Sequence, residues 1–304
     1  MMKPIVELKH LSKNIKGKEI VKDLNIELFP GQITGFLGPN GAGKTTTIRL
    51  MTGLMKPTGG EVLIDGISLA KDFEKAISKV GVIVENPEMY KFMSGYKNLL
   101  HFARMHDNVT KERIGEVVSL VGLENRIHEK VSTYSLGMRQ RLGLAQALLH
   151  HPKFLILDEP TNGLDPAGIR EFREHLRTIA QKEQVSIFVS SHLLAEIELI
   201  CDRIAVIKSG QLIEIREMTT EQQPIYYLEA GPDSEQLLTT QNYVFEKFGN
   251  GYLVSIDRDA VPKLISKLSS EGIDIFAIQP HHQSLEDQFL EITGGGQIVK
   301  ASAK

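Results

Sequence analysis

Gly38-Pro39-Asn40-Gly41-Ala42-Gly43-Lys44-Thr45-Thr46 is the stretch that decides the fold of the larger part of the chain. Its first eight residues match the pattern G-x-x-x-x-G-K-[ST], in which backbone N–H groups and a helix N-terminus converge on phosphate oxygens. The glycines let the backbone approach a ligand closely, Lys44 can reach β- and γ-phosphates, and the Thr45 hydroxyl suits Mg²⁺. We predict that the whole stretch binds a phosphate compound, with Thr45 as a metal ligand.

The segments on either side of this stretch distinguish a phosphate loop from an ordinary glycine-rich turn. Residues 33–37 (ITGFL) are a continuous run typical of a buried strand, and residues 45–54 have the spacing of a helix that stops near Gly53. A strand, a glycine-rich loop and a helix, in that order, are the context that a phosphate loop requires. Phosphate binding is therefore the interpretation that we adopt.

Two carboxylates directly follow a second apolar run, at residues 154–157. Loops at the carboxyl ends of strands meet the ligand in open α/β sheets. We therefore predict that Asp158 binds Mg²⁺ and that Glu159 polarises the attacking water. Taken alone, the pair would fit equally well the start of a turn before Pro160.

A histidine, His192, follows a third apolar run at residues 185–190. Because parallel strands end at the same edge of a sheet, we expect His192 beside Glu159, where it can contact the γ-phosphate. An isolated histidine is more often a structural residue, and its place after this strand is what favours the catalytic role.

The remaining sequence predicts two domains, at residues 1–218 and 219–304. In the first, residues 5–8 and 26–28 alternate like antiparallel strands, and residues 204–207 and 212–215 indicate a closing hairpin. A helical subdomain is expected at about residues 88–150. In the second domain, strands are expected at 225–228, 243–248, 252–256 and 273–278, with helices at 260–269 and 285–292, which makes a small α+β domain.

Composition restricts the possible functions of the 304 residues. A net charge of −3 provides no global field for nucleic acid, so no nucleic-acid partner is expected. Cys201 is the single cysteine, which excludes intramolecular disulfides and fits a reducing compartment. No stretch approaches the roughly 20 apolar residues that a spanning helix needs, so a membrane function would require another polypeptide.

The order of these motifs resembles the nucleotide-binding subunits of ABC transporters over residues 5–215. The family's signature sequence corresponds to Tyr134-Ser135-Leu136-Gly137-Met138-Arg139-Gln140-Arg141, and Asn162-Gly163-Leu164-Asp165 resembles the segment through which its subunits communicate. The resemblance implies a RecA-like core, an antiparallel β subdomain, a helical subdomain and a homodimer that encloses two ATP molecules. In such a dimer Ser135, Leu136, Gly137, Met138 and Asp165 would face the partner's nucleotide. Without the resemblance, Ser135 is a plain helix cap.

The chain departs from the family pattern at three places. The usual signature, Leu-Ser-Gly-Gly-Gln, is replaced by Tyr134 to Met138. Glu85 stands where most members have a glutamine that touches Mg²⁺; its carboxylate is a candidate metal ligand, and the alternative is a surface glutamate without a ligand. Ile15 occupies the place of the aromatic residue that stacks on adenine, and we expect it to pack on the base less specifically.

These departures, with the appended C-terminal domain, resemble the bacitracin-resistance and lantibiotic-immunity type of exporter subunit. The resemblance implies an ATPase with ATP and Mg²⁺ as cofactors, held at the cytoplasmic face of the membrane by a polytopic permease. Residues 284–290 resemble the accessory segment that ends many such subunits. A soluble ATPase of the same architecture acting on ribosomes or DNA is the alternative, although such proteins usually carry two motif sets; a small-molecule kinase would leave the signature unexplained.

Overall fold

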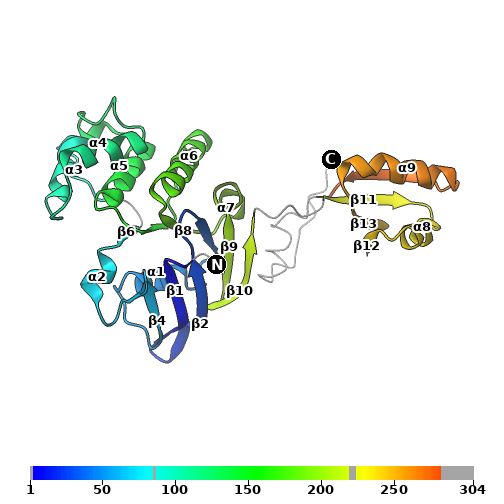
Figure 1. The fold of residues 1–304 in the computed structure, drawn as a ribbon, viewed down its shortest axis with the longest axis horizontal. Coiled ribbons are helices and arrows are strands. Elements are labelled where there is room, and N and C mark those ends of the chain that lie inside the picture. Colours follow the sequence, from blue (N-terminus) through cyan, green and yellow to red (C-terminus); the bar gives the residue numbers. More distant parts are fainter. Residues whose placement is uncertain (1–2, 85–86, 219–223, 282–304) are drawn as a thin grey trace, which may run out of the picture. The chain divides into compact units, whose positions relative to one another are not determined.

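The structure is a computed structural model, and it describes residues 3–84, 87–218 and 224–281. The chain forms two compact units, Met1–Thr219 and Thr220–Lys304 (Figure 1). Each unit has its own sheet and its own apolar core. The predicted helix at residues 285–292 and the residues at 284–290 lie outside the described residues.

A six-stranded sheet forms the centre of the first unit, in the order β10-β9-β3-β8-β7-β6. All pairs are parallel except β9 with β10, which form the predicted closing hairpin. Every residue of β3, β7 and β8 is buried, because helices or a second sheet cover both faces. The strands are β3 (Ile33–Leu37), β6 (Val80–Ile83), β7 (Phe154–Asp158), β8 (Ser186–Ser191), β9 (Arg203–Lys208) and β10 (Gln211–Glu217).

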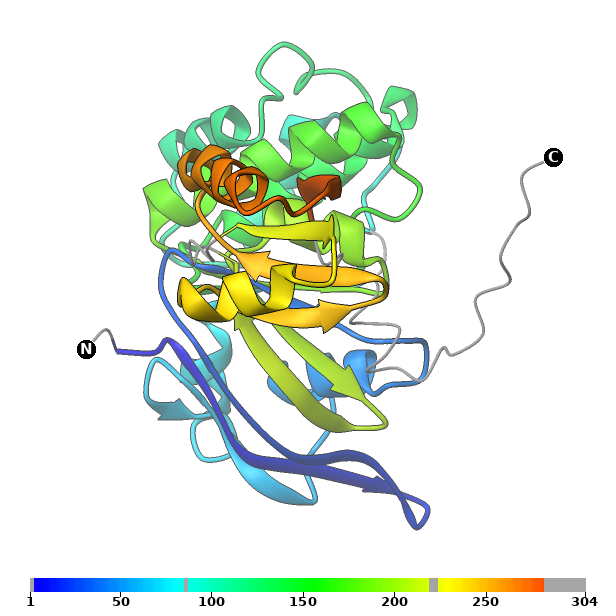
Figure 2. The ribbon, with the colours of Figure 1, turned by 90° about the vertical axis from the view of Figure 1, so that its right-hand side faces the viewer.

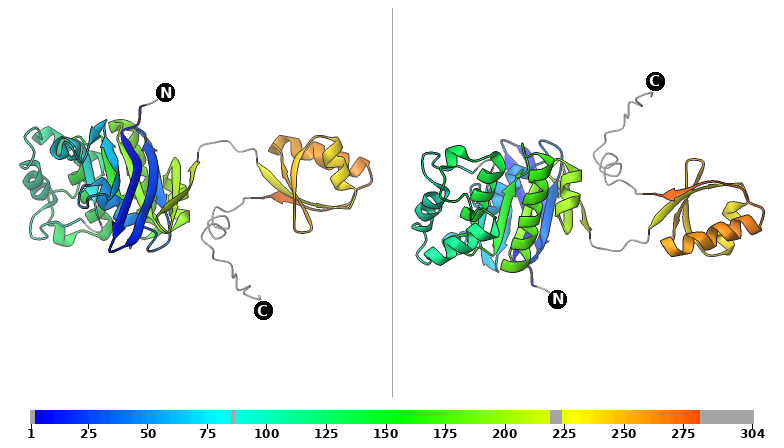
Figure 3. Two further views of the ribbon diagram at one scale, coloured as in Figure 1. Left: turned by 90° about the horizontal axis from the view of Figure 1, so that it is seen from below. Right: turned by 90° about the horizontal axis from the view of Figure 1, so that it is seen from above.

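An antiparallel sheet in the order β2-β1-β4-β5 covers one side of this unit. Alternating apolar residues of β1 and β2 form a core with α1 and with Phe36, Phe154 and Phe188 of the central sheet. The two panels of Figure 3 show this blue sheet on the side opposite the green helix α6. The elements are β1 (Val6–Ile15), β2 (Lys18–Leu28), β4 (Gly59–Ile64), β5 (Ile67–Ser68), α1 (Lys44–Met51), α2 (Phe73–Ile77) and α6 (Pro166–Glu183).

Three α-helices follow β6 and gather at one end of the first unit (Figure 1). They form the predicted helical subdomain: α3 (Gly95–Ala103), α4 (Lys111–Leu120) and α5 (Leu136–Leu148), with the short 3-10 helix η1 (Val131–Thr133) before α5. Arg113 of α4, only 4% exposed, binds both carboxylate oxygens of Glu183 at 3.1 and 2.9 Å, which joins this subdomain to the end of α6. The remaining helix of the unit, α7 (Leu194–Ile200), lies between β8 and β9 in the chain.

The second unit is a four-stranded antiparallel sheet with two helices on one face. Its strands have the order β12-β13-β11-β14, and α8 and α9 contribute Leu238, Leu264 and Leu268 to a core with Tyr226 and Val254. The sheet is drawn in yellow and orange in Figure 2. The elements are β11 (Ile225–Ala230), α8 (Ser234–Thr240), β12 (Val244–Phe248), β13 (Gly251–Ser255), η2 (Arg258–Ala260), α9 (Val261–Ser270) and β14 (Ile275–Pro280).

The predicted α/β class is confirmed, with its antiparallel and helical subdomains and a smaller α+β unit. The helix predicted over residues 45–54 ends at Met51, because the chain turns at Gly53 with a φ of 71°. The sequence analysis did not predict β4, β6, α7 or α8, which are short or lack clear periodicity. No helix in the described part of the chain is long and apolar enough to cross a membrane.

Candidate active site

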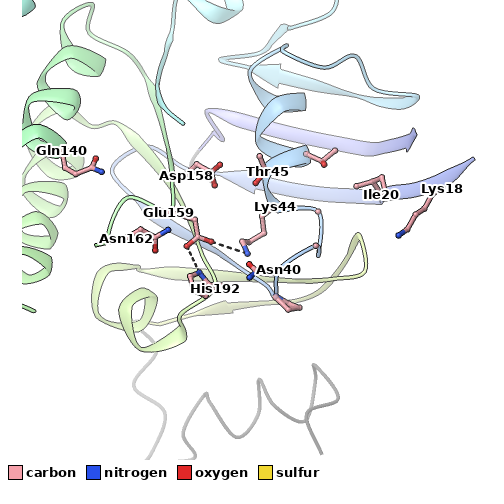
Figure 4. Close-up of a pocket in the computed structure, with 14 residues that line it drawn as sticks. Lys18, Ile20, Asn40, Lys44, Thr45, Gln140, Asp158, Glu159, Asn162 and His192 are labelled. Carbon is pink, nitrogen blue, oxygen red and sulfur yellow. Dashed lines mark hydrogen bonds and ion pairs between the residues drawn. The ribbon is translucent and has the colours of Figure 1, made fainter. Parts of the chain in front are cut away.

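A cavity of about 820 Å³ lies at the carboxyl ends of the central strands of the first unit (Figure 4). This is the edge of an open α/β sheet where ligands bind. Its walls come from β2, the loop before α1, α5, and the segments that follow β7 and β8. The lining residues are Lys18, Ile20, Pro39, Asn40, Gly41, Gly43, Lys44, Thr45, Thr46, Gln140, Asp158, Glu159, Asn162 and His192.

The loop between β3 and α1 is built to leave its amides available. Gly43 is the N-cap of α1 with a φ of 111°, and no side chain caps the helix. A Cβ atom on Gly43 would lie 2.9 Å from the Ile20 carbonyl oxygen, so only glycine fits here. The uncapped start of α1, with the positive end of the helix, therefore faces the cavity, which is an arrangement that binds phosphate.

The Lys44 side chain lies between the phosphate loop and Glu159. Its side chain is 7% exposed, and its ammonium donates to the Gly38 carbonyl at 2.7 Å. The same Nζ atom lies 3.5 Å from Oε1 of Glu159. The ammonium thus stands between the phosphate loop and the carboxylate after β7, where it can approach the terminal phosphates of a nucleotide.

The carboxylates after β7 are held in place by β8. Ser190 of β8 donates from its hydroxyl to Oδ1 of Asp158 at 2.5 Å, and its Oγ accepts from the Glu159 amide at 3.0 Å. Glu159 has a φ of 49°, in the left-handed region that residues with a side chain rarely adopt. Such backbone conformations are concentrated at functional sites, and here the turn directs the Glu159 side chain into the cavity (Figure 4).

The Glu159 carboxylate is contacted from two sides. His192, from the segment after β8, places Nδ1 2.8 Å from Oε2 of Glu159, while Lys44 approaches the other carboxylate oxygen. The carboxylate therefore lies between the ammonium of Lys44 and the imidazole of His192. The structure thus brings Lys44, Asp158, Glu159 and His192 together, as the sequence analysis expects from the common strand edge.

The residues expected to face a partner's nucleotide do not line this chain's own cavity. Ser135 is exposed and is the N-cap of α5, where its hydroxyl accepts from the Met138 amide at 3.2 Å. Asp165 is the exposed N-cap of α6, and its carboxylate accepts from the Gly168 amide at 2.7 Å. Leu136, Gly137 and Met138 form the first turn of α5. Within one chain these residues are helix caps and helix starts.

The structure describes only one of the two other candidates. Glu85 lies outside the described residues, so its metal contact stays a prediction. Ile15 ends β1, pairs with Lys18 across the hairpin and is 37% exposed, and it does not line the cavity. Lys18 and Ile20 of β2 form that wall instead.

Two further lining residues, besides Lys18 and Ile20, were not predicted for this chain's own cavity. Gln140 of α5 is 1% exposed, and its Oε1 has no hydrogen-bond partner among the described residues. Asn162 follows β7 and Glu159. Both belong to stretches that the resemblance assigns to contact between subunits. Because of that assignment, the sequence analysis did not expect them beside the chain's own phosphate loop.

Comparisons with known proteins agree with this geometry. Residues 21–162 match the family described as ABC transporter. The ABC transporter ATP-binding protein YhcH of Bacillus subtilis is 54% identical over 96% of this chain and 97% of its own length. The bacitracin transport ATP-binding protein BcrA of Bacillus licheniformis is 38% identical, over 98% of this chain and 100% of its own length.

Solved structures share the fold of the first unit. Clostridium perfringens cbiO1, part of the ABC transporter complex cbiONQ, is 27% identical with a TM-score of 0.66, over 71% of this chain and 89% of its own. A dimeric ATP-binding cassette in a post-hydrolysis state, bound to ADP and Pi, is 23% identical with a TM-score of 0.62, over 71% of this chain and 99% of its own. On the motifs, the cavity and these relatives together, the chain belongs to the ATP-binding subunits of ABC transporters and is an ABC transporter ATPase.

Proposed function

We propose that this ATPase energises the export of peptide antibiotics or similar amphiphilic compounds through a separate membrane permease. The relatives carry this proposal, because the likeness to the bacitracin transport protein BcrA covers nearly the whole chain and includes the second unit. The linearmycin resistance protein LnrL of Bacillus subtilis is 31% identical over 95% of the chain. The lantibiotic transport protein SrtF of Streptococcus pyogenes is 38% identical over 70%.

In the proposed chemistry, Glu159 acts on water and not on the nucleotide. A water oxygen bonds to the γ-phosphorus while the bond from that phosphorus to the β–γ bridging oxygen breaks, which releases ADP and phosphate. The carboxylate of Glu159 polarises this water and takes up its proton. His192, 2.8 Å from that carboxylate, fixes its orientation and lies where it can contact the γ-phosphate. Lys44 counters the negative charge of the β- and γ-phosphates.

The residues around Asp158 suit a magnesium ion. Mg²⁺ prefers hard oxygen ligands, and the cavity offers the Asp158 carboxylate and the Thr45 hydroxyl beside the phosphate loop. Asp158 is 4% exposed and accepts from Ser190, which orients its carboxylate. When bound there, the ion would neutralise charge on the phosphates. Glu85 is proposed as a further ligand to it.

The cap residues of α5 and α6 suit a second copy of the chain. Ser135 and Asp165 are exposed, Gly137 is half-buried, and none of the three is among the described residues that line the chain's own cavity. A Cβ atom on Gly137 would meet only Leu164, at 3.7 Å, so the start of α5 is open to a close approach. We assign it to the γ-phosphate of the partner, with two nucleotides enclosed in the homodimer.

The permease is proposed to dock on the helical subdomain, which follows Glu85 in the chain. Tyr90, Phe92 and Met105 are 43%, 70% and 63% exposed, and the rings of Tyr90 and Phe92 contact each other at 5.8 Å. Exposed apolar side chains that contact each other, such as Tyr90 and Phe92, are typical of a contact surface. This docking would hold the chain at the cytoplasmic face of the membrane.

Drug sensitivity tests the proposed export directly. The chain and a candidate polytopic permease would be expressed together in a susceptible bacterium, with a Glu159→Gln chain as the matched control. Wild-type protein should raise the inhibitory concentration of bacitracin, a lantibiotic or linearmycin by severalfold, and Glu159→Gln should not. Equal sensitivity of both strains to all three compounds would refute the export function and leave the ATPase assignment intact.

A further inference from the structure

Ser190 of β8 is buried next to both carboxylate residues of the site. It is 0% exposed and is not among the described residues that line the cavity. Strands β7 and β8 are parallel neighbours, and their register places Ser190 beside Asp158. A hydroxyl at a fully buried strand position costs free energy unless it forms hydrogen bonds. The hydrogen bonds of Ser190 are therefore what a serine provides at this position.

The hydrogen bonds of the Ser190 hydroxyl have a fixed direction. The Glu159 amide can only donate, so Oγ of Ser190 accepts from it, at 3.0 Å. A hydroxyl has one proton, and Ser190 donates that proton to Oδ1 of Asp158 at 2.5 Å. One hydroxyl thus joins the carboxylate of the proposed metal ligand to the backbone of the proposed general base.

The Glu159 amide is held twice by Ser190. Besides Oγ, the Ser190 carbonyl oxygen accepts from this amide, at 3.2 Å. Glu159 has a φ of 49°, and a residue with a side chain keeps such a backbone conformation only where its surroundings fix it. This turn determines where the Glu159 carboxylate meets Lys44 and His192, at 3.5 and 2.8 Å. Loss of the hydroxyl would remove one of the two contacts from Ser190 that hold the turn.

We propose that Ser190 is a positioning residue whose hydroxyl couples the binding of Mg²⁺ at Asp158 to the orientation of Glu159. The inference rests on the roles proposed above for these two carboxylates, and it gives Ser190 no contact with the nucleotide. Loss of a side chain that hydrogen-bonds a metal-binding carboxylate typically lowers metal affinity or activity by about 10- to 100-fold. Removal of the hydroxyl should therefore weaken binding of the ion and slow turnover together, while ATP binding without the ion stays the same.

Threonine and valine at position 190 separate the hydroxyl from the space that it occupies. The two side chains are both β-branched, and only threonine has a hydroxyl. In Ser190→Thr, turnover of ATP by the full-length chain should stay within about threefold of the wild-type rate, whereas Ser190→Val should lose about 10- to 100-fold. ATP affinity in EDTA, measured by displacement of a fluorescent ATP analogue, should be the same in both variants. Equal turnover in the two variants would overturn the proposal.

Binding of the ion is measured without turnover in the Glu159→Gln background. Mn²⁺, a paramagnetic substitute for Mg²⁺, is titrated into the chain with ATP, and its EPR signal reports the free ion. Adding Ser190→Val should lower the Mn²⁺ affinity by about tenfold, and adding Ser190→Thr should not. Unchanged Mn²⁺ affinity in the valine variant would overturn the coupling, because the hydroxyl would then act on Glu159 alone. Failure of the proposed role of Glu159 would be recognised separately, by wild-type turnover in Glu159→Gln alone.

Ser186 provides the matched control at the other end of β8. It is also 0% exposed, it pairs with Phe154 at the start of β7, and its hydroxyl has no hydrogen-bond partner among the described residues. Ser186→Val therefore repeats the substitution on the same strand, away from both carboxylates. It should leave turnover and Mn²⁺ affinity unchanged. Losses in Ser186→Val equal to those in Ser190→Val would show that both act by distorting the strand, and would contradict the role of Ser190.

Discussion

The N-termini of α1 and α5 differ in how they are capped and in what surrounds them. At α1, Gly43 leaves the first amides without a side-chain cap, and residues of the same chain enclose them in the cavity. At α5, the Ser135 hydroxyl caps the Met138 amide, and the helix start lies on the surface. The first is a phosphate site that one chain completes. In our account the second becomes a phosphate site only against another copy.

The largest expected effect comes from a substitution that removes the general base and leaves both helix N-termini unchanged. Glu159→Gln keeps the shape of the side chain and removes the base, so turnover should fall by about 10³-fold while ATP binding persists. Phosphate release and equilibrium nucleotide binding measure the two properties separately. Turnover near the wild-type rate would contradict the role of Glu159.

The same substitution of glycine by alanine should act differently at the two helix starts. In Gly43→Ala the left-handed φ of 111° and the Ile20 carbonyl both oppose a Cβ, so nucleotide binding and melting temperature should both fall. In Gly137→Ala there is room within the chain, so melting temperature should stay unchanged. Turnover should still fall, by about 10- to 100-fold, because the partner's phosphate can no longer approach as closely. Wild-type turnover in Gly137→Ala would contradict a contact between the start of α5 and the partner's phosphate.

Ser135→Asp separates the cap from the phosphate contact. Aspartate caps a helix about as well as serine, so the melting temperature should change little. Its negative charge would face the partner's triphosphate, and turnover should fall by about tenfold. Thermal melts and phosphate release on the same preparation provide the comparison, with Ser135→Asn as the neutral control that retains the cap. Equal rates for the two variants would argue that Ser135 only caps its helix.

The smallest effect concerns the junction that supports the far end of α5. His150 follows α5, and its Nε2 lies 3.1 Å from the Val80 carbonyl of β6. Burial and the stacked His106 lower the pKa of His150 below its ordinary value of 6.5. Between the folded and unfolded pKa values the unfolded chain binds more protons, so stability falls as the pH drops below about 6.5. The melting temperature should decline less between pH 7.5 and 5.5 in His150→Gln, and an equal decline would exclude His150 as the cause.

The sequence predicts best where local chemistry and topology coincide. The phosphate loop has few alternatives once a buried strand precedes it and a helix follows it. Asp158, Glu159 and His192 could be placed together because parallel strands end at one edge. Neither the motif nor the common strand edge predicts which residues of a β-hairpin line the cavity, because that depends on the register in which its strands pair. Ile20 lines the cavity and Ile15 does not, because the hairpin places β2 directly on the phosphate loop.

Gln140 shows a second limit of sequence reasoning. It belongs to the helix whose first turn is assigned to a partner, yet its own side chain reaches the chain's own cavity from α5. The packing of α5 in the helical subdomain determines where the Gln140 side chain points. No local sequence pattern predicts that packing. The short strand β6 was likewise missed, because four residues give too little alternation to distinguish a strand.

The completion of the active site by a second copy is tested most directly by the mass of the Glu159→Gln chain in solution. This variant should bind ATP and hydrolyse it too slowly to release the closed state. Light scattering after size exclusion should then show a monomer without nucleotide and a dimer with ATP, and Gly137→Ala added to Glu159→Gln should prevent the dimer. A strict monomer with ATP bound, at every protein concentration, would contradict the account.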